Sequence, residues 1–152
     1  MRLAALILLA LGLSAGGATG AAHAPAGSLL IEGGRGLVQI TGRGVLVGRL
    51  ERGSLEIVDL NPADEWSPRV NGIPRGRLVT LRGRNVTFFV PGGPYRLVAR
   101  GVGISISARG AGTVVLDGVP DTVGDTGHYA VGDADPAPLP SEPARVTFGA
   151  GD

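Results

Sequence analysis

The chain has 152 residues, a formal net charge of +1, no cysteine and only two histidines. The absence of cysteine excludes a disulfide-stabilised scaffold, and one or two histidines alone do not make a typical zinc site. Glycine and proline are abundant, at 27 and 11 residues, a composition that indicates disorder unless a periodic pattern accompanies it. A periodic pattern of apolar residues is present, so we expect one folded domain.

The amino-terminal segment has the plan of a signal peptide. Arg2 precedes an apolar run over residues 3–13, and small residues follow up to Ala24. A helix of about 11 residues spans about 16 Å, roughly half of a bilayer's hydrocarbon core, which disfavours a transmembrane anchor. We therefore expect a signal peptide at 1–24, cleaved between residues 20 and 24. The predicted localisation is secreted, or periplasmic and envelope-associated, without an integral membrane segment after processing.

After this segment, apolar side chains alternate with polar or very small ones, which is the pattern of β-strands with one buried face. The predicted strands cover residues 37–41, 45–50, 55–60, 78–82, 86–90, 95–99, 102–107, 113–116 and 145–148. No stretch shows helical spacing with capping residues. The sequence therefore predicts a single all-β domain over residues 25–152.

Glycines separate the later strands at a nearly regular interval. They occupy positions 83, 92, 101, 110 and 118, about nine residues apart. Glycine adopts positive φ at little steric cost and is common in tight hairpin turns. We therefore expect short antiparallel strands joined by glycine-rich turns, as a sandwich or a barrel-like meander. A β-solenoid with parallel stacking between its coils is the alternative.

Two parts of the chain resemble each other. LVQITGRGV, which begins at Leu37, and LVTLRGRNV, which begins at Leu78, are identical at five of nine positions. This similarity fits tandem β units at 28–60 and 77–118. Because turns rich in glycine and arginine align with one another in any case, it fits a domain without repeats equally well.

The GRGV and ARGVGISISARG segments, together with the signal peptide, resemble those of uncharacterised secreted all-β proteins of high-GC bacteria. The resemblance spans most of the chain that follows the signal peptide. It implies an exported β domain and brings no activity, cofactor or site residue with it.

Charge is distributed unevenly. Residues 35–109 contain twelve arginines against five acids, a net charge of +7, whereas residues 110–152 contain one arginine against seven acids, a net charge of −6. Arginine makes planar bidentate contacts with phosphate and carboxylate groups. We therefore expect a non-enzymatic binding or structural module of the cell envelope. Its partner would be an anionic cell-wall polymer, or an envelope protein, held on an arginine-rich β surface.

The candidate ligand-binding residues are Arg82, Arg84, Arg100, Arg109 and Trp66. The arginines also fit a simpler role, because charge keeps strand ends hydrated and opposes edge-to-edge aggregation. The tryptophan lies in the longest segment without strand periodicity, where its ring either closes the β core or stacks on a sugar. The acidic, loop-rich segment at 119–152 could fold back onto the basic surface and neutralise it.

Catalytic and metal-binding patterns are sparse. His128 is the only histidine that remains wherever the signal peptide is cleaved, no G-x-S-x-G motif is present, and Ser105 and Ser107 are predicted to face outward from a strand. The alternative function is an extracellular hydrolase that acts on polysaccharide through paired carboxylates. Asp121 and Asp125 are weak calcium candidates, because their spacing lacks the EF-hand pattern and aspartate is common in turns. We expect no cofactor, no metal site and no enzymatic activity.

Overall fold

The computed structural model describes residues 27–149, so the predicted signal peptide lies outside the described residues. The strands are β1 (Ser28–Asp59), β2 (Arg69–Val70), β3 (Ile73–Pro74), β4 (Leu78–Val90), β5 (Pro94–Gly118), β6 (His128–Val131), β7 (Ala137–Pro138) and β8 (Ala144–Phe148). Every strand pairing is antiparallel. The prediction of an all-β antiparallel domain is confirmed. Across residues 27–149, the structure contains no helix long and apolar enough to cross a membrane.

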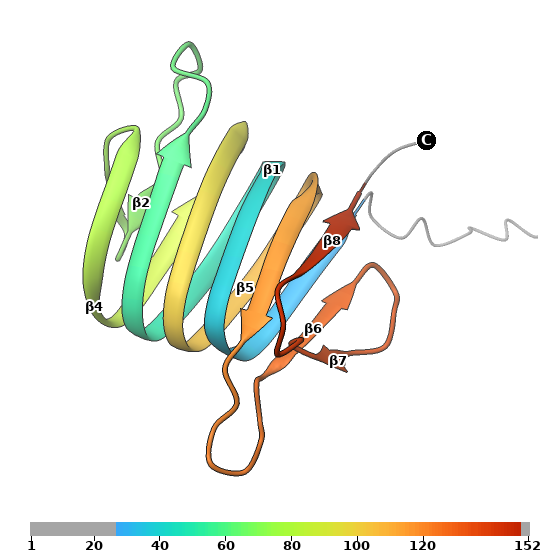
Figure 1. The fold of residues 1–152 in the computed structure, drawn as a ribbon. Helices are drawn as coiled ribbons and strands as arrows, with labels where there is room; N and C mark the ends of the chain where they lie inside the picture. Colours follow the sequence, from blue (N-terminus) through green and yellow to red (C-terminus); the bar gives the residue numbers. More distant parts are fainter. Residues whose placement is uncertain (1–26, 150–152) are drawn as a thin grey trace, which may run out of the picture.

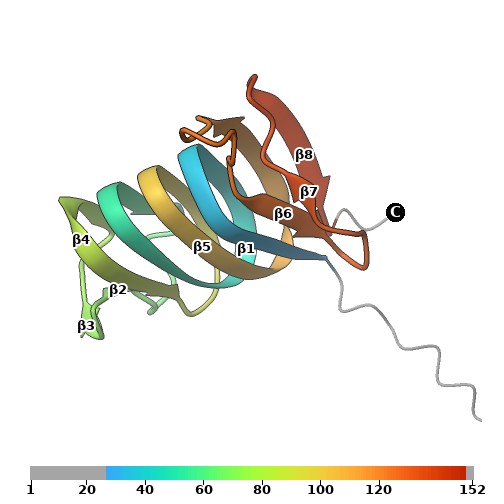
Figure 2. The ribbon, with the colours of Figure 1, turned by 90° about the horizontal axis from the view of Figure 1, so that it is seen from below.

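The two longest strands, β1 and β5, wind around each other as a flattened coil with two facing layers (Figures 1 and 2). The first layer contains, in spatial order, residues 28–35, 102–109, 45–52 and 84–90. The second layer contains, in spatial order, β8 and residues 111–118, 36–43, 94–101, 53–59 and 78–82. The sheet is therefore open rather than closed as a barrel, and the parallel stacking of a solenoid is not seen in the described part of the chain. The two segments considered as tandem units pair with each other in this one sheet.

Glycines form the bends at which the long strands pass between layers. Gly53 of β1 lies opposite Gly101 of β5, and Gly44 lies opposite Gly110, all four with φ between 126° and 153°. A Cβ on any of these four would collide with a carbonyl oxygen of the neighbouring strand. These glycines thus bend continuous strands, where we had expected hairpin turns. The strands are correspondingly longer than the sequence indicated, because β1 and β5 bend together and stay paired.

The apolar face of each layer points into the space between them. Alternation along β5 buries Leu97 and Ala99 in the second layer and Ile104 and Ile106 in the first. Burying a leucine or isoleucine side chain contributes on the order of 1.5–3 kcal/mol to folding. The facing apolar surfaces therefore hold the two layers together.

The two ends of the coil are closed differently. At one end, β2 pairs with residues 88–89 of β4, and β3 pairs with β2. At the other end, β6 pairs with residues 29–32 of β1, and β8 pairs with residues 112–116 of β5. The acidic carboxyl-terminal segment therefore completes the end opposite β4 and does not cover the arginines of that strand (Figure 1).

Replacing Gly44 by alanine is expected to lower the free energy of unfolding by about 2 kcal/mol or more, because the bend combines positive φ with close backbone contact. The measurement is urea unfolding followed by tryptophan fluorescence. Gly76→Ala is the matched control, since a Cβ at position 76 meets nothing within 4 Å. Equal stability of the two variants would contradict the role assigned to the bend.

Candidate functional site

One edge of the coil carries a line of glycine bends with arginines on both sides. Gly53 lies opposite Gly83 of β4 and Gly101 of β5, and Gly36 also lies opposite Gly101. An arginine stands next to each of these glycines in the sequence. We call the five arginines along this line the arginine ridge: Arg35, Arg52, Arg82, Arg84 and Arg100.

Strand register sets the spacing within the ridge. In the first layer, Arg52 lies directly opposite Arg84, and Val102 separates Arg52 from Arg35. In the second layer, Arg82 and Arg100 lie on either side of Ser54. Neighbouring strands are about 4.8 Å apart, so the ridge presents several guanidinium groups within reach of one extended ligand.

Two hollows lie along the ridge on either side of Val102. One has a volume of about 340 Å³ and is lined by Arg49, Glu51, Arg52, Arg84, Asn85 and Val102. The other has a volume of about 260 Å³ and is lined by Arg35, Gly36, Gly101, Val102 and Val119. The ridge therefore offers shaped surface as well as charge.

The charge of the ridge is largely uncompensated. Among the described residues, the ion pairs are Arg49–Glu51 at 4.0 Å and Arg96–Glu56 at 3.3 Å, and neither includes a ridge arginine. The Nε atom of Arg35 is buried and has no hydrogen-bond partner in the described part of the chain. Like charges placed directly opposite on paired strands are destabilising. An anion bound between them would relieve that repulsion.

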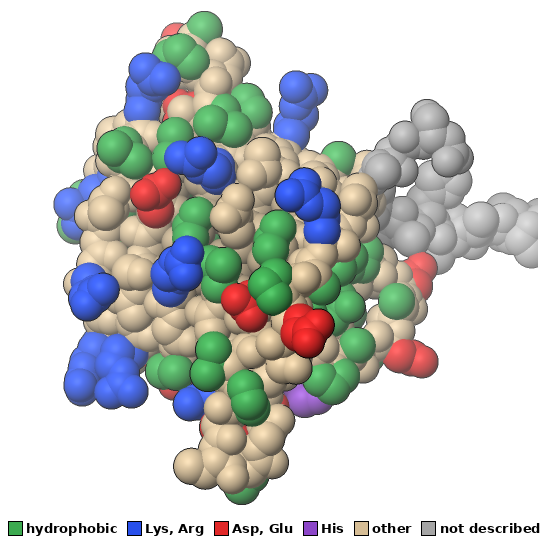
Figure 3. All heavy atoms as spheres, viewed as in Figure 1, with side chains coloured by type: hydrophobic (Ala, Val, Ile, Leu, Met, Phe, Trp, Pro, Cys, Tyr) green, Lys and Arg blue, Asp and Glu red, His purple; other side chains and the backbone are tan. Residues whose placement is uncertain are grey.

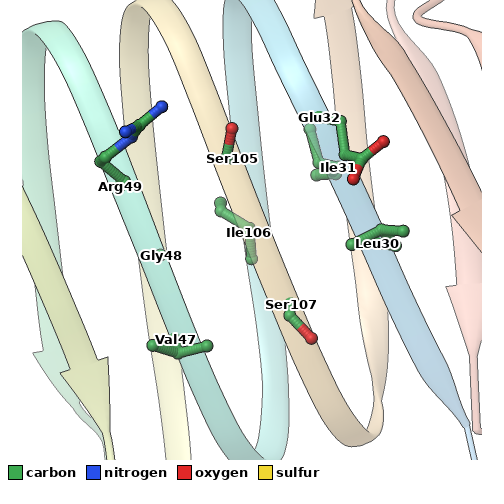
Figure 4. Close-up of a pocket in the computed structure, with 9 residues that line it drawn as sticks. All are labelled: Leu30, Ile31, Glu32, Val47, Gly48, Arg49, Ser105, Ile106 and Ser107. Atoms are coloured by element: carbon green, nitrogen blue, oxygen red, sulfur yellow. The ribbon is translucent and has the colours of Figure 1, made fainter.

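A third hollow lies on the outer face of the first layer and shares Arg49 with the hollow beside Arg52 and Arg84 (Figure 4). Its volume is about 370 Å³. Ser105 and Ser107 lie along its middle strand, while Leu30 and Val47 stand on the two flanking strands. Short side chains between longer ones make a shallow trough, which we call the serine groove. As predicted from the sequence, both serines face outward.

Three of the predicted binding arginines, Arg82, Arg84 and Arg100, come together in the ridge. Arg109 does not, because it precedes the bend at Gly110 on the opposite edge of the coil, where it is exposed. The ridge also contains two arginines that the sequence analysis did not select, Arg35 and Arg52. Each of the two precedes a glycine at a bend, so the Arg-Gly dipeptide was a sequence signal that could have identified them. The sequence does not show which of these bends lie on the same edge of the coil, because that depends on the register between strands.

Trp66 lies away from the ridge. Its ring is partly buried against the hydrophobic core, and its Nε1 atom would contact a Cβ placed on Gly93. Two residues after Gly93, Tyr95 is fully buried, and its hydroxyl has no hydrogen-bond partner among residues 27–149. Burial raises the pKa of Tyr95 to about 12. Trp66 therefore packs against the core beside the bend at Gly93, and Tyr95 is part of the core itself.

The two calcium candidates, Asp121 and Asp125, accept hydrogen bonds from the backbone of one turn. The Oδ1 atom of Asp121 accepts hydrogen bonds from the backbone N–H groups of Val123 and Asp125, at 2.8 and 3.0 Å. These bonds lower the pKa of Asp121, with a smaller contribution from Arg35. Asp125 in turn accepts a bond from the N–H of Gly127 at 2.8 Å. Within the described residues, no three acidic, histidine or cysteine side chains gather as they would around a metal ion.

The hollows of this surface bring no pair of acids together. Glu32 is the one acid that lines the serine groove, and Glu51 is the one acid that lines the hollow beside Arg84. Glycoside hydrolysis through paired carboxylates requires two such groups across one cleft. None of these three hollows therefore favours the alternative of a hydrolase.

The chain matches no protein-family model, no curated protein and no solved structure. No relative therefore supplies a function for the arginine ridge. Its chemistry is inferred from the arrangement of its own side chains.

The opposed arginines give a prediction about stability. Replacing Arg84 by glutamine is expected to raise the free energy of unfolding by about 0.5 kcal/mol at low salt, because it removes the like charge opposite Arg52. The gain should disappear at about 1 M salt, where the screening length is about 3 Å. Arg69→Gln is the control, since Arg69 lies opposite Phe89 and Pro74. A gain that persists at high salt, or appears equally in the control, would contradict the assignment.

The buried tyrosine gives a prediction about pH. The pKa of an unfolded tyrosine is about 10, and burial raises the pKa of Tyr95 to about 12. Its contribution to stability is therefore complete below pH 10 and is lost as the pH rises to 12. In Tyr95→Phe this loss should be absent. At neutral pH the variant should stay within about 1 kcal/mol of the parent, since the hydroxyl makes no hydrogen bond among the described residues. The measurement is urea unfolding across this pH range, with Tyr129→Phe as the control that keeps the loss.

Proposed function

We propose that this domain is a non-enzymatic binding module of the cell envelope that holds a linear acidic polysaccharide on the arginine ridge. The observation that carries the proposal is the direct opposition of Arg52 and Arg84 without an acidic partner among the described residues. Two guanidinium groups at this spacing repel each other when the site is empty. A carboxylate or sulfate between them accepts charge-assisted hydrogen bonds from both.

The extent of the ridge supports a polymer rather than a small anion. Arg35, Arg52 and Arg84 lie on the first, third and fourth strands of the first layer, so the row spans about 14 Å. Arg82 and Arg100 form a second row across the bend. Each exposed contact contributes little by itself, but several contacts along one chain add up to useful affinity.

The serine groove supports a polysaccharide among anionic polymers. Arg49 lines both this groove and the ridge hollow, so one ligand can occupy both. The groove combines the apolar side chains of Leu30 and Val47 with the hydroxyls of Ser105 and Ser107. A sugar ring presents apolar C–H faces and hydroxyls and suits such a surface, whereas a chain made only of phosphates does not. The signal-peptide pattern supports export to the envelope, where the polymer would be met.

The proposal is tested by binding of the full chain to polygalacturonate at low and at high salt. Binding should weaken as salt rises, because the contacts are between exposed charges. Replacing Arg52, Arg84 and Arg100 together by serine should weaken binding by about tenfold or more, which corresponds to about 1.4 kcal/mol. The charge-matched control replaces Arg43, Arg69 and Arg109, which lie off the ridge.

Three outcomes would contradict the proposal. One is binding whose affinity does not change with salt concentration. Another is equal loss in the ridge variant and in its charge-matched control, which would mean that net charge alone attracts the polymer. The third is tighter binding of polyphosphate than of polygalacturonate, which would remove the role of the serine groove.

A further inference from the structure

The second layer ends in two strands that each have one open side. Residues 78–82 of β4 pair with β1, and β8 pairs with residues 112–116 of β5. Within residues 27–149, no other backbone pairs with the far side of either strand. An open strand exposes a row of unpaired N–H and C=O groups that can pair with another chain.

The open side of β4 is accessible. A hollow of about 220 Å³ lies beside it, lined by residues 78–81 of β4 and by the turn at Arg75 and Gly76. Leu78 is 62% exposed, and a Cβ on Gly76 would meet nothing within 4 Å. No described backbone hydrogen-bonds to this side of residues 78–82, so its backbone groups are available to another strand.

The two ends of the molecule carry opposite charge (Figure 3). The β4 end bears Arg69, Arg75, Arg77, Arg82 and Arg84, against Asp64 and Glu65. The end formed by β6, β7 and β8 bears Asp117, Asp121, Asp125, Asp133, Asp135 and Glu142, against Arg145. Two β4 ends would repel each other, as would two β8 ends, whereas a β4 end attracts a β8 end.

We propose that the partner of the open β4 edge is the β8 edge of a second copy of this chain. Strands alternate in direction across the second layer, and β8 and β4 occupy its first and sixth positions. A second β8 placed beside β4 therefore continues the antiparallel alternation. The contact joins two different surfaces, so it is heterologous, and repeated from molecule to molecule it builds an open chain or a closed ring.

Side-chain alternation limits this contact to registers that keep the exposed faces of the two strands on one side, and we propose one of them. In β4, Leu78, Thr80 and Arg82 are exposed while Val79 faces the core, and in β8, Arg145 and Thr147 are exposed while Phe148 is buried. Placing Leu78 opposite Thr147 sets Thr80 opposite Arg145 and brings Glu142 beside Arg82 and Arg84. A shift of two residues would set Arg82 opposite Arg145, a repulsive pair.

Cysteine cross-linking tests this register, because the chain contains no cysteine of its own. Leu78→Cys and Thr147→Cys, made in separate full chains with tags of different mass, are mixed with a short bis-maleimide. The expected product joins one chain of each kind. Thr41→Cys replaces Thr147→Cys in the control, since Thr41 is exposed on the same face in the middle of the layer. No mixed product, or a product mainly of two Leu78→Cys chains, would overturn the proposal.

Charge reversal separates this proposal from polysaccharide binding, on which it does not depend. Glu142→Arg should lower the average mass measured by sedimentation equilibrium toward that of a monomer, while polygalacturonate binding persists. Glu65→Arg makes the same charge change at the β4 end and should not weaken association. If the parent chain is a monomer at all concentrations and salt levels, or if both variants associate equally, the proposal is wrong, and the polysaccharide assay is unaffected by that result.

Discussion

The structure depends on the close backbone contact between glycines at the paired bends. At Gly53 and Gly101, and again at Gly44 and Gly110, there is no room for a Cβ beside the carbonyl oxygen of the neighbouring strand. Because these positions lack side chains, β1 and β5 bend at the same places and remain hydrogen-bonded through the bend. Two strands thereby supply most of both layers and enclose the hydrophobic core between them.

The same bends explain why arginines gather along one edge. An arginine adjoins each glycine of the ridge, and sheet register stacks those bends over one another. Four of these arginines, Arg52, Arg82, Arg84 and Arg100, are exposed while sheet pairing fixes their backbone. Like charges such as Arg52 and Arg84 are thus held at strand spacing, where a flexible loop would let them separate. The rigidity of the coil is what makes a row of repelling charges available to a ligand.

The winding also gives the molecule two unlike ends. The coil starts with β6 and β8 beside β1 and β5 and finishes with β4, so the acidic carboxyl-terminal segment is built into the end away from the arginine-rich strand. Its acids compensate little of the ridge charge. The domain therefore combines a basic edge, a neutral groove and oppositely charged ends within one open sheet (Figures 1 and 3).

Local pattern by itself determined the strand character of the chain and its uneven charge, because side chains alternate across a strand whatever its partner. For the same reason it left the parallel stacking of a solenoid open beside antiparallel pairing, and only the structure decided between them. The sequence also showed glycines between the predicted strands. A positive φ occurs both in a hairpin turn and in a bend of a continuous strand, so the prediction of hairpin turns at Gly101 and Gly110 was wrong. Only the tertiary structure decided that Arg52 faces Arg84 while Arg109 lies on the far edge. The reason is physical. The pairing of β1 with β4 and β5 joins residues that are far apart in the chain, and the local pattern of each strand does not encode which residues lie opposite one another.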